Sequence, residues 1–493
     1  MDLLLQGLTN VFAPTTIILL IAGVIVGIII GALPGLTATM GVALFLPVTF
    51  GMDAVTGILL LIGVYFGSIY GGSISAILLN TPGTPASAAT ALDGYQLTKQ
   101  GKAGKALGTA AIASGVGGIL SVIMLVFISP QLAQLALDFS APEMFGLALF
   151  GLSIISSISG GSMLKGLIAG VLGLVIATIG MDPMTSYPRF TFDQLSLLNG
   201  LSFIPVMIGL FAVSEALVIM EEQLTDGQGL KKIMASYVLP KWNELKKLWI
   251  TMLRSGFIGT FIGIIPGAGA DIAAFVSYNE AKRFSKKEEK DTFGKGNLKG
   301  VAASEAANNG VTGGAMVPLL TLGIPGDAVT AVLLGALVVQ GIQPGPQLFT
   351  TSADLVYTLF AGMFVANILM LIFGISGIRL FTKILKVPKN IIAPVILVLS
   401  TIGAFAIANN FFDVYTMLGA GIIGYFMKKF GFPASPIVLA LILGPMAESE
   451  LRRTLIMSEG SYSIFLDRPI ALVLIIFAVL SLVLPLVWSK IKK

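Results

Sequence analysis

Long runs of apolar residues without charge are the feature that most constrains how this chain folds. From Leu3 to Leu92 the only charged side chain is Asp53. Each such run can cross a bilayer, which takes about 20 apolar residues. Counting them predicts an all-α integral membrane protein with about 10 to 12 transmembrane segments, several of them broken or re-entrant at Gly and Pro. The later runs are 107–129, 144–164, 194–214, 355–378, 390–412 and 469–488.

The composition supports this interpretation and excludes several kinds of chemistry. Hydrophobic residues make up 55% of the 493 residues and charged residues 11%, against about 25% charged residues in a typical globular protein. The chain has neither Cys nor His. Thiol chemistry, disulfides, imidazole bases and most zinc or haem sites are therefore excluded. We expect no catalytic residue, no cofactor, and no metal ion other than Na+.

Basic residues occur in clusters between the apolar runs. The net charge of +5 is modest, so the clusters indicate membrane orientation, not nucleic-acid binding. By the positive-inside rule they face the cytoplasm. No Lys or Arg precedes Lys99, so we do not expect a cleavable signal peptide. The clusters are 99–105, 231–247, 282–299, 379–389, 428–429 and 490–493.

The most polar interval near the middle of the chain predicts a division into two halves. We interpret this interval as a cytoplasmic linker. The predicted organisation is a first transmembrane repeat at 1–222, the linker at 223–250, a second transmembrane repeat at 251–445, and a polar connection with a C-terminal transmembrane helix at 446–493.

Both halves carry two Pro-Gly pairs. In the first half these begin at Pro34 and Pro82, and in the second at Pro266 and Pro325. The offsets between corresponding pairs are 232 and 243 residues, so the second half has 11 additional residues between its pairs. The extra residues are expected in or near the charged loop 280–299.

The positions of the basic loops predict how the halves are oriented. In the first half the basic loop 99–105 follows the second Pro-Gly pair, whereas in the second half the basic loop 282–299 lies between the two pairs. Equivalent loops then lie on opposite sides of the membrane. This is the expected signature of an inverted-topology repeat, as in many secondary transporters.

The second Pro-Gly pair of each half is the predicted substrate site. Pro and Gly interrupt a membrane helix, and the freed backbone groups are tolerated where they line a cavity. Helix N-termini at such breaks offer N–H donors that suit a carboxylate. The alternative is a pair of helix kinks with ordinary capping residues. The predicted substrate-binding residues are Asn80, Thr81, Pro82, Gly83, Thr84 and Ser87, with Gly323, Ile324, Pro325, Gly326 and Asp327.

A second polar segment, "GVAASEAANNGVTGG" at 300–314, is a candidate ion site. Glu305 is spaced three and four residues from Asn308 and Asn309, so these side chains can share one helical face. Together with Ser304 they offer oxygens for a hard cation such as Na+. Asp271 is a further candidate, as an acid near membrane depth. The alternative is an interfacial helix end with ordinary capping.

Long motifs carry a resemblance to a known family. The segments 70–108, 263–286 and 300–346, including "LLNTPGTPASAATALDG" and "TLGIPGDAVTAVLLG", resemble the large permease subunit (TctA type) of bacterial tripartite tricarboxylate transporters. The resemblance covers almost the whole chain. It implies a multi-pass protein of the bacterial inner membrane that works with a small membrane subunit and a periplasmic substrate-binding protein. It also implies uptake of a carboxylate, bound between the Pro-Gly motifs and driven by a Na+ or H+ gradient.

The residues also bear on other functions. No G-x-x-x-x-G-K-[ST] motif is present for ATP. "GAGAD" has one residue too many to match the Gly-x-Gly-Asp of membrane aspartyl proteases, and without His neither a Ser-His protease nor a usual zinc enzyme is possible. A channel remains as an alternative. Without His, we favour Na+ or a carboxylate proton relay for coupling, and the identity of the carboxylate stays open.

Overall fold

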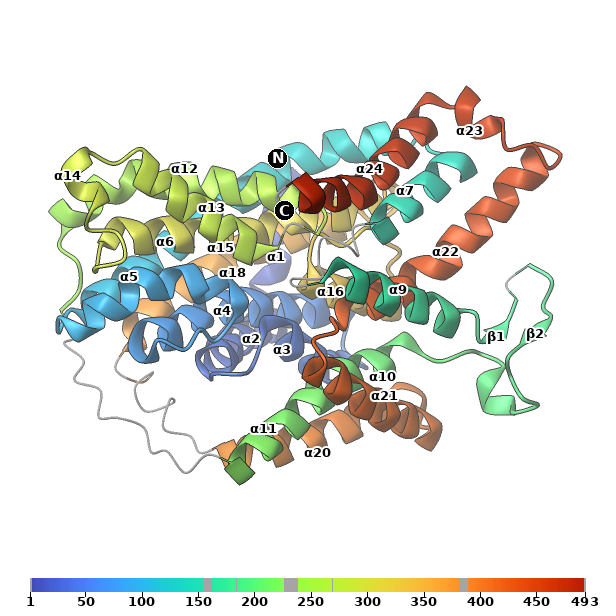
Figure 1. The fold of residues 1–493 in the computed structure, drawn as a ribbon, viewed down its shortest axis with the longest axis horizontal. Helices are drawn as coiled ribbons and strands as arrows, with labels where there is room; N and C mark the ends of the chain where they lie inside the picture. The colour runs from blue at the N-terminus through green and yellow to red at the C-terminus, as the bar shows by residue number, and fades with distance from the viewer. Residues whose placement is uncertain are drawn as a thin grey trace.

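The structure is a computed structural model that describes residues 2–153, 162–182, 184–225, 238–267, 269–378, 380 and 389–491. In these residues helices dominate (Figure 1). The strands found there are β1 (Gly180–Met181) and β2 (Pro188–Arg189), which pair antiparallel as a short hairpin. The expectation of an all-α architecture is confirmed.

Five helical stretches in the described part of the chain are long and apolar enough to cross a membrane. They are α2 (Pro14–Ala32), α4 (Ala54–Leu79), α6 (Ala103–Ala136), the stretch Phe203–Glu221 and α18 (Ala353–Ser376). Six shorter apolar stretches of 10–17 residues accompany them. Because a full crossing takes about 20 residues, the stretches within short helices fit broken segments better than complete passes, whereas Ile391–Ala406 and Pro469–Val483 belong to the longer helices α20 (Lys389–Ala408) and α24 (Pro469–Ile491). The six stretches are Ala38–Thr49, Ala141–Ser153, Met163–Ala177, Ala328–Val339, Ile391–Ala406 and Pro469–Val483.

The two halves have the same order of elements around their Pro-Gly pairs. In each, a long helix, a short helix, a second long helix, a short helix and a third long helix follow one another. The first series is α2, α3 (Ala38–Phe45), α4, α5 (Ala88–Lys99) and α6; the second is α12 (Trp242–Ile264), α13 (Ala270–Arg283), α15 (Leu298–Leu322), α16 (Ala328–Val339) and α18. The extra helix α14 (Lys287–Lys290) stands in the charged loop where the 11 additional residues were expected.

Glycines bring the first two long helices of each half into backbone contact. A Cβ at Gly23 would lie 2.3 Å from the carbonyl oxygen of Leu60, and one at Gly31 would lie 2.2 Å from that of Ser68. In the second half, a Cβ at Gly259 would lie 2.1 Å from the carbonyl oxygen of Ala307. Small residues permit such close packing between membrane helices. The contacts advance together along both helices, so α2 and α4 run in the same direction.

The chain therefore has to return between α2 and α4. The hydroxyls of Thr16 and Thr56 lie 3.0 Å apart near the starts of the two helices. The helix α3 and the turn Leu46–Thr49 make the return. Asp53 then begins α4 by accepting a hydrogen bond from the backbone N–H of Thr56 at 3.0 Å. This is the re-entrant geometry expected from Pro34-Gly35.

Most of the remaining helices form two groups beside these two series (Figure 1), whereas α1 packs against α18. One group consists of α7, α9, α22 and α24. The other consists of α20 and α21, which pack with α10, with α11 and with the π-helical segment Gly209–Val213 that joins α10 to α11. The α22 helix crosses the expected boundary at 445. Their bounds, with the short α1, α17 and α23, are α1 (Asp2–Val11), α7 (Ala141–Ser153), α9 (Met163–Ala177), α10 (Phe203–Ile208), α11 (Ser214–Thr225), α17 (Leu348–Thr351), α20 (Lys389–Ala408), α21 (Phe411–Lys429), α22 (Ser435–Met457), α23 (Ile464–Asp467) and α24 (Pro469–Ile491).

The basic loops 99–105 and 282–299 meet at one end of the molecule. Gln100 Nε2 donates a hydrogen bond of 2.7 Å to the carbonyl of Lys295, and Lys105 forms an ion pair of 2.6 Å with Glu244 at the start of α12. Figure 1 shows α14 at this end and the β1–β2 hairpin with α23 at the other. Of the expected linker 223–250, residues 226–237 lie outside the described residues, and α12 begins within it at Trp242.

Candidate functional site

A cavity of about 420 Å³ lies where the four Pro-Gly breaks come together. Each break contributes the first residues of the segment that follows it. The walls are completed by Ile69 of α4 and Ser435 of α22. The lining residues are Thr37, Ala38, Thr39, Ile69, Thr84, Pro85, Ala86, Gly267, Gly269, Ala270, Asp271, Ile272, Asp327, Ala328, Val329 and Ser435. We call this the central cavity.

Backbone geometry matches between the breaks at the offsets seen in the sequence. α4 ends at Asn80 with φ 58°, and α15 ends at Gly323 with φ 69°, both left-handed. Thr84 and Asp327 are the N-cap residues of the segments that follow. Both pairs are 243 residues apart in the chain. The two breaks therefore have the same local construction.

Gly83 and Gly326 both lie close to the backbone of the long helices that precede them. A Cβ at Gly83 would lie 2.0 Å from the carbonyl oxygen of Gly31. One at Gly326 would lie 2.9 Å from the carbonyl oxygen of Gly263 and 2.7 Å from the Cα of Ala315. Distances under 3 Å to backbone atoms leave no room for a side chain. Glycine is required here for close packing of each break against the preceding long helix.

Asp327 is a buried carboxylate on the wall of the central cavity. Its Oδ1 accepts hydrogen bonds of 2.7 Å from the backbone N–H and from the hydroxyl of Thr330, which caps α16. Its Oδ2 accepts a 2.9 Å hydrogen bond from the hydroxyl of Tyr65 in α4. Sequence reasoning did not identify Tyr65, because a tyrosine inside a long apolar helix carries no motif or spacing.

The other predicted substrate residues differ in how far their side chains are exposed. Asn80 and Thr81 are exposed at the turn after α4, and Pro82 is partly buried. The hydroxyl of Ser87 donates to the carbonyl of Thr84 at 2.8 Å, so Ser87 acts as an ordinary capping residue, as the alternative interpretation of this motif predicts. Ile324 and Pro325 are buried. Of the eleven residues, Thr84 and Asp327 line the central cavity.

The candidate ion residues fall into separate places. Asp271 lines the central cavity. Glu305 is fully buried on α15 and accepts hydrogen bonds from three hydroxyls: from Ser73 at 2.5 Å, from Ser114 at 3.0 Å, and from Thr90. These hydroxyls belong to α4, α6 and α5, so one carboxylate of the second half joins three helices of the first.

The polar side chains near Glu305 on α15 differ in their hydrogen bonding. Ser304 donates to the carbonyl of Gly300 at 3.0 Å. Asn309 donates through Nδ2 to the carbonyl of Glu305 at 3.2 Å. Asn308 is fully buried, and neither of its polar side-chain atoms has a hydrogen-bond partner among the described residues.

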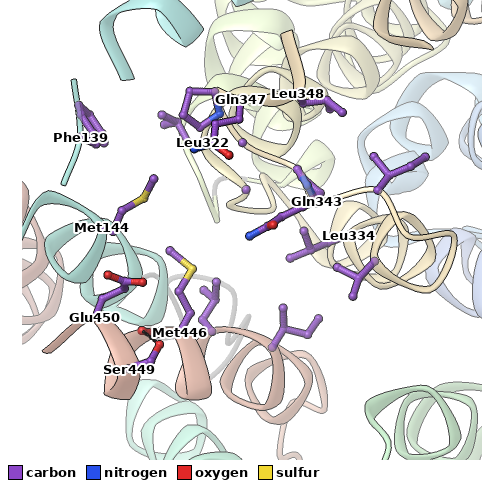
Figure 2. A pocket seen from close by; sticks show the side chains of 18 of the residues that line it. Phe139, Met144, Leu322, Leu334, Gln343, Gln347, Leu348, Met446, Ser449 and Glu450 are labelled. Atoms are coloured by element: carbon purple, nitrogen blue, oxygen red, sulfur yellow. Dashed lines mark hydrogen bonds between the residues drawn. The ribbon is translucent and has the colours of Figure 1, made fainter. Parts of the chain in front are cut away.

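A second, larger cavity of about 850 Å³ lies on the other side of the break after α15. It is lined by Leu322 and Gly323 from the break, by the segment 341–348 and by the part of α22 from Ile442 to Met457. Figure 2 shows Gln343 and Met446 pointing into it from facing walls. We call this the outer cavity, because α22 leads from here toward the end of the molecule that carries the hairpin (Figure 1).

Ion pairs connect the β1–β2 hairpin to α22 beyond the outer cavity. Arg189 bonds Glu448 at 2.7 Å, and Arg452 pairs with Asp182 at 2.9 Å. Backbone N–H groups of Thr185 and Met184, with Arg452, lower the pKa of Asp182 to about 2. The hairpin thus holds the outer half of α22 in place.

Broken helices around a central cavity, within an apolar all-helical fold, are typical of membrane transport proteins. Over residues 17–439 the chain matches the "Tripartite tricarboxylate transporter TctA family". It belongs to this family, as its motifs indicated.

Two relatives from Agrobacterium vitis are similar to the chain. One, described as an "Uncharacterized 52.8 kDa protein in TAR-I ttuC' 3'region", is 38% identical over 465 residues, covering 94% of this chain and 92% of the relative. The other, an "Uncharacterized protein in TAR-II ttuC' 3'region", is 38% identical over 235 residues, covering 47% of this chain and 96% of the relative. Neither description names an activity.

Proposed function

We propose that this protein is the large permease subunit of a binding-protein-dependent secondary transporter that takes up an organic carboxylate. The observation that carries the proposal is the convergence of four helix beginnings on the central cavity, at Thr37, Thr84, Gly269 and Asp327. Helix N-termini present N–H donors and positive dipole ends, which favour a carboxylate. The acids Asp271 and Asp327 in the same cavity favour an accompanying cation.

We further propose that the two halves are inverted repeats. Ser73 of α4 contacts Glu305, and Tyr65, two turns earlier on α4, contacts Asp327, which follows the end of α15. The equivalent helices α4 and α15 therefore run in opposite directions. An inverted pair with broken helices at its interface supports alternating access, in which one part of the protein moves against the other.

The outer cavity is the proposed access route from the periplasm. It lies away from the basic loops, which the positive-inside rule places in the cytoplasm, and it reaches Gly323 at the break. In this proposal a periplasmic binding protein delivers the carboxylate to the outer cavity. A rearrangement of the break Gly323–Asp327 then admits it to the central cavity, and a small membrane subunit completes the complex in the inner membrane.

Uptake into vesicles tests this proposal. The chain would be reconstituted with its small subunit and binding protein, and radiolabelled citrate, other tricarboxylates, dicarboxylates and aromatic acids would be compared as substrates. We expect uptake that requires an inward ion gradient, Na+ in preference to H+. Uptake that persists after both gradients are collapsed would contradict the coupling, and ion currents without any carboxylate would favour the channel alternative.

A further inference from the structure

Several buried polar atoms without partners among the described residues lie on α15 and at Thr84, which lines the central cavity. Asn308 Oδ1 and Nδ2, Asn309 Oδ1 and Thr84 Oγ1 are all buried and lack a hydrogen-bond partner among the described residues. Leaving such a group unpaired away from water is costly, and nearly all buried polar groups in native proteins are paired. Unpaired groups of this kind indicate a missing polar ligand.

Packing places the segment that begins at Thr84 along the part of α15 that carries Asn308. Ala86 packs in one small cluster with Ala307, Val311 and Ala315 of α15, together with Ala270 and Ala273 of α13. One turn further along, the hydroxyl of Thr90 donates to Glu305. Thr84 therefore lies next to the part of α15 that carries Asn308.

The repeat shows what is different about this pair. Thr84 corresponds to Asp327 at the 243-residue offset, and at the same offset Tyr65 corresponds to Asn308. In one half the long Tyr65 side chain reaches Asp327 and closes the pair with a hydrogen bond. In the other half the shorter Asn308 leaves both members unpaired. Tyr65 and Asp327 are thus hydrogen-bonded to each other, whereas the equivalent residues Asn308 and Thr84 have no hydrogen-bond partner among the described residues.

We infer that Thr84 and Asn308 bind the coupling Na+ next to the carboxylate of the substrate. Hard cations take oxygen ligands, and Thr84 Oγ1 and Asn308 Oδ1, with Asn309 Oδ1 next to them in the chain, have no hydrogen-bond partner among the described residues. The remaining Asn308 Nδ2 donates a hydrogen bond to the substrate carboxylate. One side chain then contacts both ligands, so each raises the affinity for the other. This inference rests on the proposed function and names its ion site.

Na+-dependent thermal unfolding of the detergent-solubilised full chain tests the site without knowledge of the substrate. NaCl would be titrated against KCl at constant ionic strength, because a ligand of the folded state raises the unfolding temperature by an amount that grows with the logarithm of one plus the ratio of the Na+ concentration to Kd. We expect NaCl to raise the unfolding temperature of the unaltered protein. In Asn308→Leu and Thr84→Val the Kd for Na+ should rise at least about tenfold.

The two variants have matched controls. Leu and Val keep the branched shapes of Asn and Thr without their unpaired polar atoms, so we expect no loss of stability in KCl; Asn308→Ala serves if Leu does not fit. Asn367→Leu, on α18, removes another buried amide with an unpaired Oδ1 and should keep the full response to NaCl.

Two results would overturn the inference: an unchanged Kd for Na+ in both Asn308→Leu and Thr84→Val, or no effect of Na+ on the unfolding temperature of the unaltered protein. If carboxylate uptake were then found to be driven by protons, the proposed transport function would still hold, but without this Na+ site. A Na+ response lost in the two variants supports the site even if vesicle uptake fails, in which case the proposed function is what is contradicted.

Discussion

The hydroxyl of Tyr65 donates a 2.9 Å hydrogen bond to Oδ2 of Asp327, joining a long helix of the first half to the break of the second. Both side chains are buried. The other carboxylate oxygen, Oδ1, caps α16 through Thr330. The bond therefore couples the beginning of α16, on the wall of the central cavity, to the position of α4.

Tyr65→Phe should impair uptake and lower stability. The substitution leaves Asp327 Oδ2 buried with one donor fewer, at a cost of about 1–3 kcal/mol in the free energy of unfolding. Thermal unfolding and initial uptake rates in vesicles would measure the two effects. Tyr425→Phe is the control, because Tyr425 donates to Glu221 in an exposed contact and should change both quantities little. Equal behaviour of the two variants would contradict a role for the Tyr65 bond.

Alanine at Gly83 or Gly326 should abolish most uptake. The new Cβ at Gly83 would lie 2.0 Å from the carbonyl oxygen of Gly31, so α2 or the break has to shift. Overpacking of this kind costs about 1–3 kcal/mol. Uptake per molecule inserted in the membrane is the measurement, since it separates transport from abundance.

Gly419→Ala is the matched control for this prediction. No atom of the described residues lies within 4 Å of a Cβ at Gly419, and Ala in an exposed helix position of α21 gains up to about 1 kcal/mol over Gly. We expect unchanged or raised stability and normal uptake. Normal uptake in Gly83→Ala as well would show that the close approach is not required.

Asp93→Ala should release the basic loop 282–299 from α5. Asp93 accepts hydrogen bonds from the hydroxyl of Tyr278 and from the backbone N–H groups of Gly294, Gly296 and Asn297, all at 2.8–2.9 Å. Bonds to a charged group are worth about 1.5–3 kcal/mol each. Limited proteolysis should then cut faster within 284–297.

Asp291, an exposed acid of the loop 282–299, provides the comparison. Asp291→Ala also removes one negative charge there, but it breaks none of the bonds that Asp93 makes. We expect its proteolysis rate to stay near that of the unaltered protein. If Asp291→Ala were cut as fast as Asp93→Ala, loop charge and not the Asp93 bonds would explain the effect.

The hairpin network predicts a dependence on acid pH. The folded pKa of Asp182, about 2, lies below the unfolded value of about 3.9. A lowered pKa stabilises the fold above about pH 4, and this stabilisation is lost as pH falls toward 2. Asp182→Asn keeps an acceptor for the backbone N–H groups but has no charge to lose. The stability difference between the two proteins should therefore shrink between pH 4 and pH 2, and a constant difference would contradict the assignment.

The four Pro-Gly breaks could be found from the sequence because helix-breaking pairs are unusual within apolar runs, and residues following all four line the central cavity. The cavity-lining roles of Thr84 and Asp327 followed from their position after a break. Ser87 could not be separated from them, since the same position also caps a helix, and its hydroxyl bonds to Thr84.

The polar contacts between halves could not be predicted. Glu305 stood out as an acid in an apolar stretch, but Ser73, Thr90 and Ser114 lie on three helices at unrelated spacings. Serine and threonine in membrane helices commonly bond their own backbone, so nothing in the sequence distinguishes these three. Which hydroxyls reach the carboxylate depends on how the helices pack.

Protection of a cysteine in the central cavity by substrate would show whether the carboxylate binds there. The chain has no native Cys, so Ser435→Cys, on the cavity wall, would carry the only thiol of the permease. We predict that a thiol reagent modifies it, blocks carboxylate uptake in vesicles, and is slowed by the transported carboxylate with its binding protein. Modification that proceeds at the same rate with substrate, while uptake continues, would contradict a substrate site at the convergence of the four breaks.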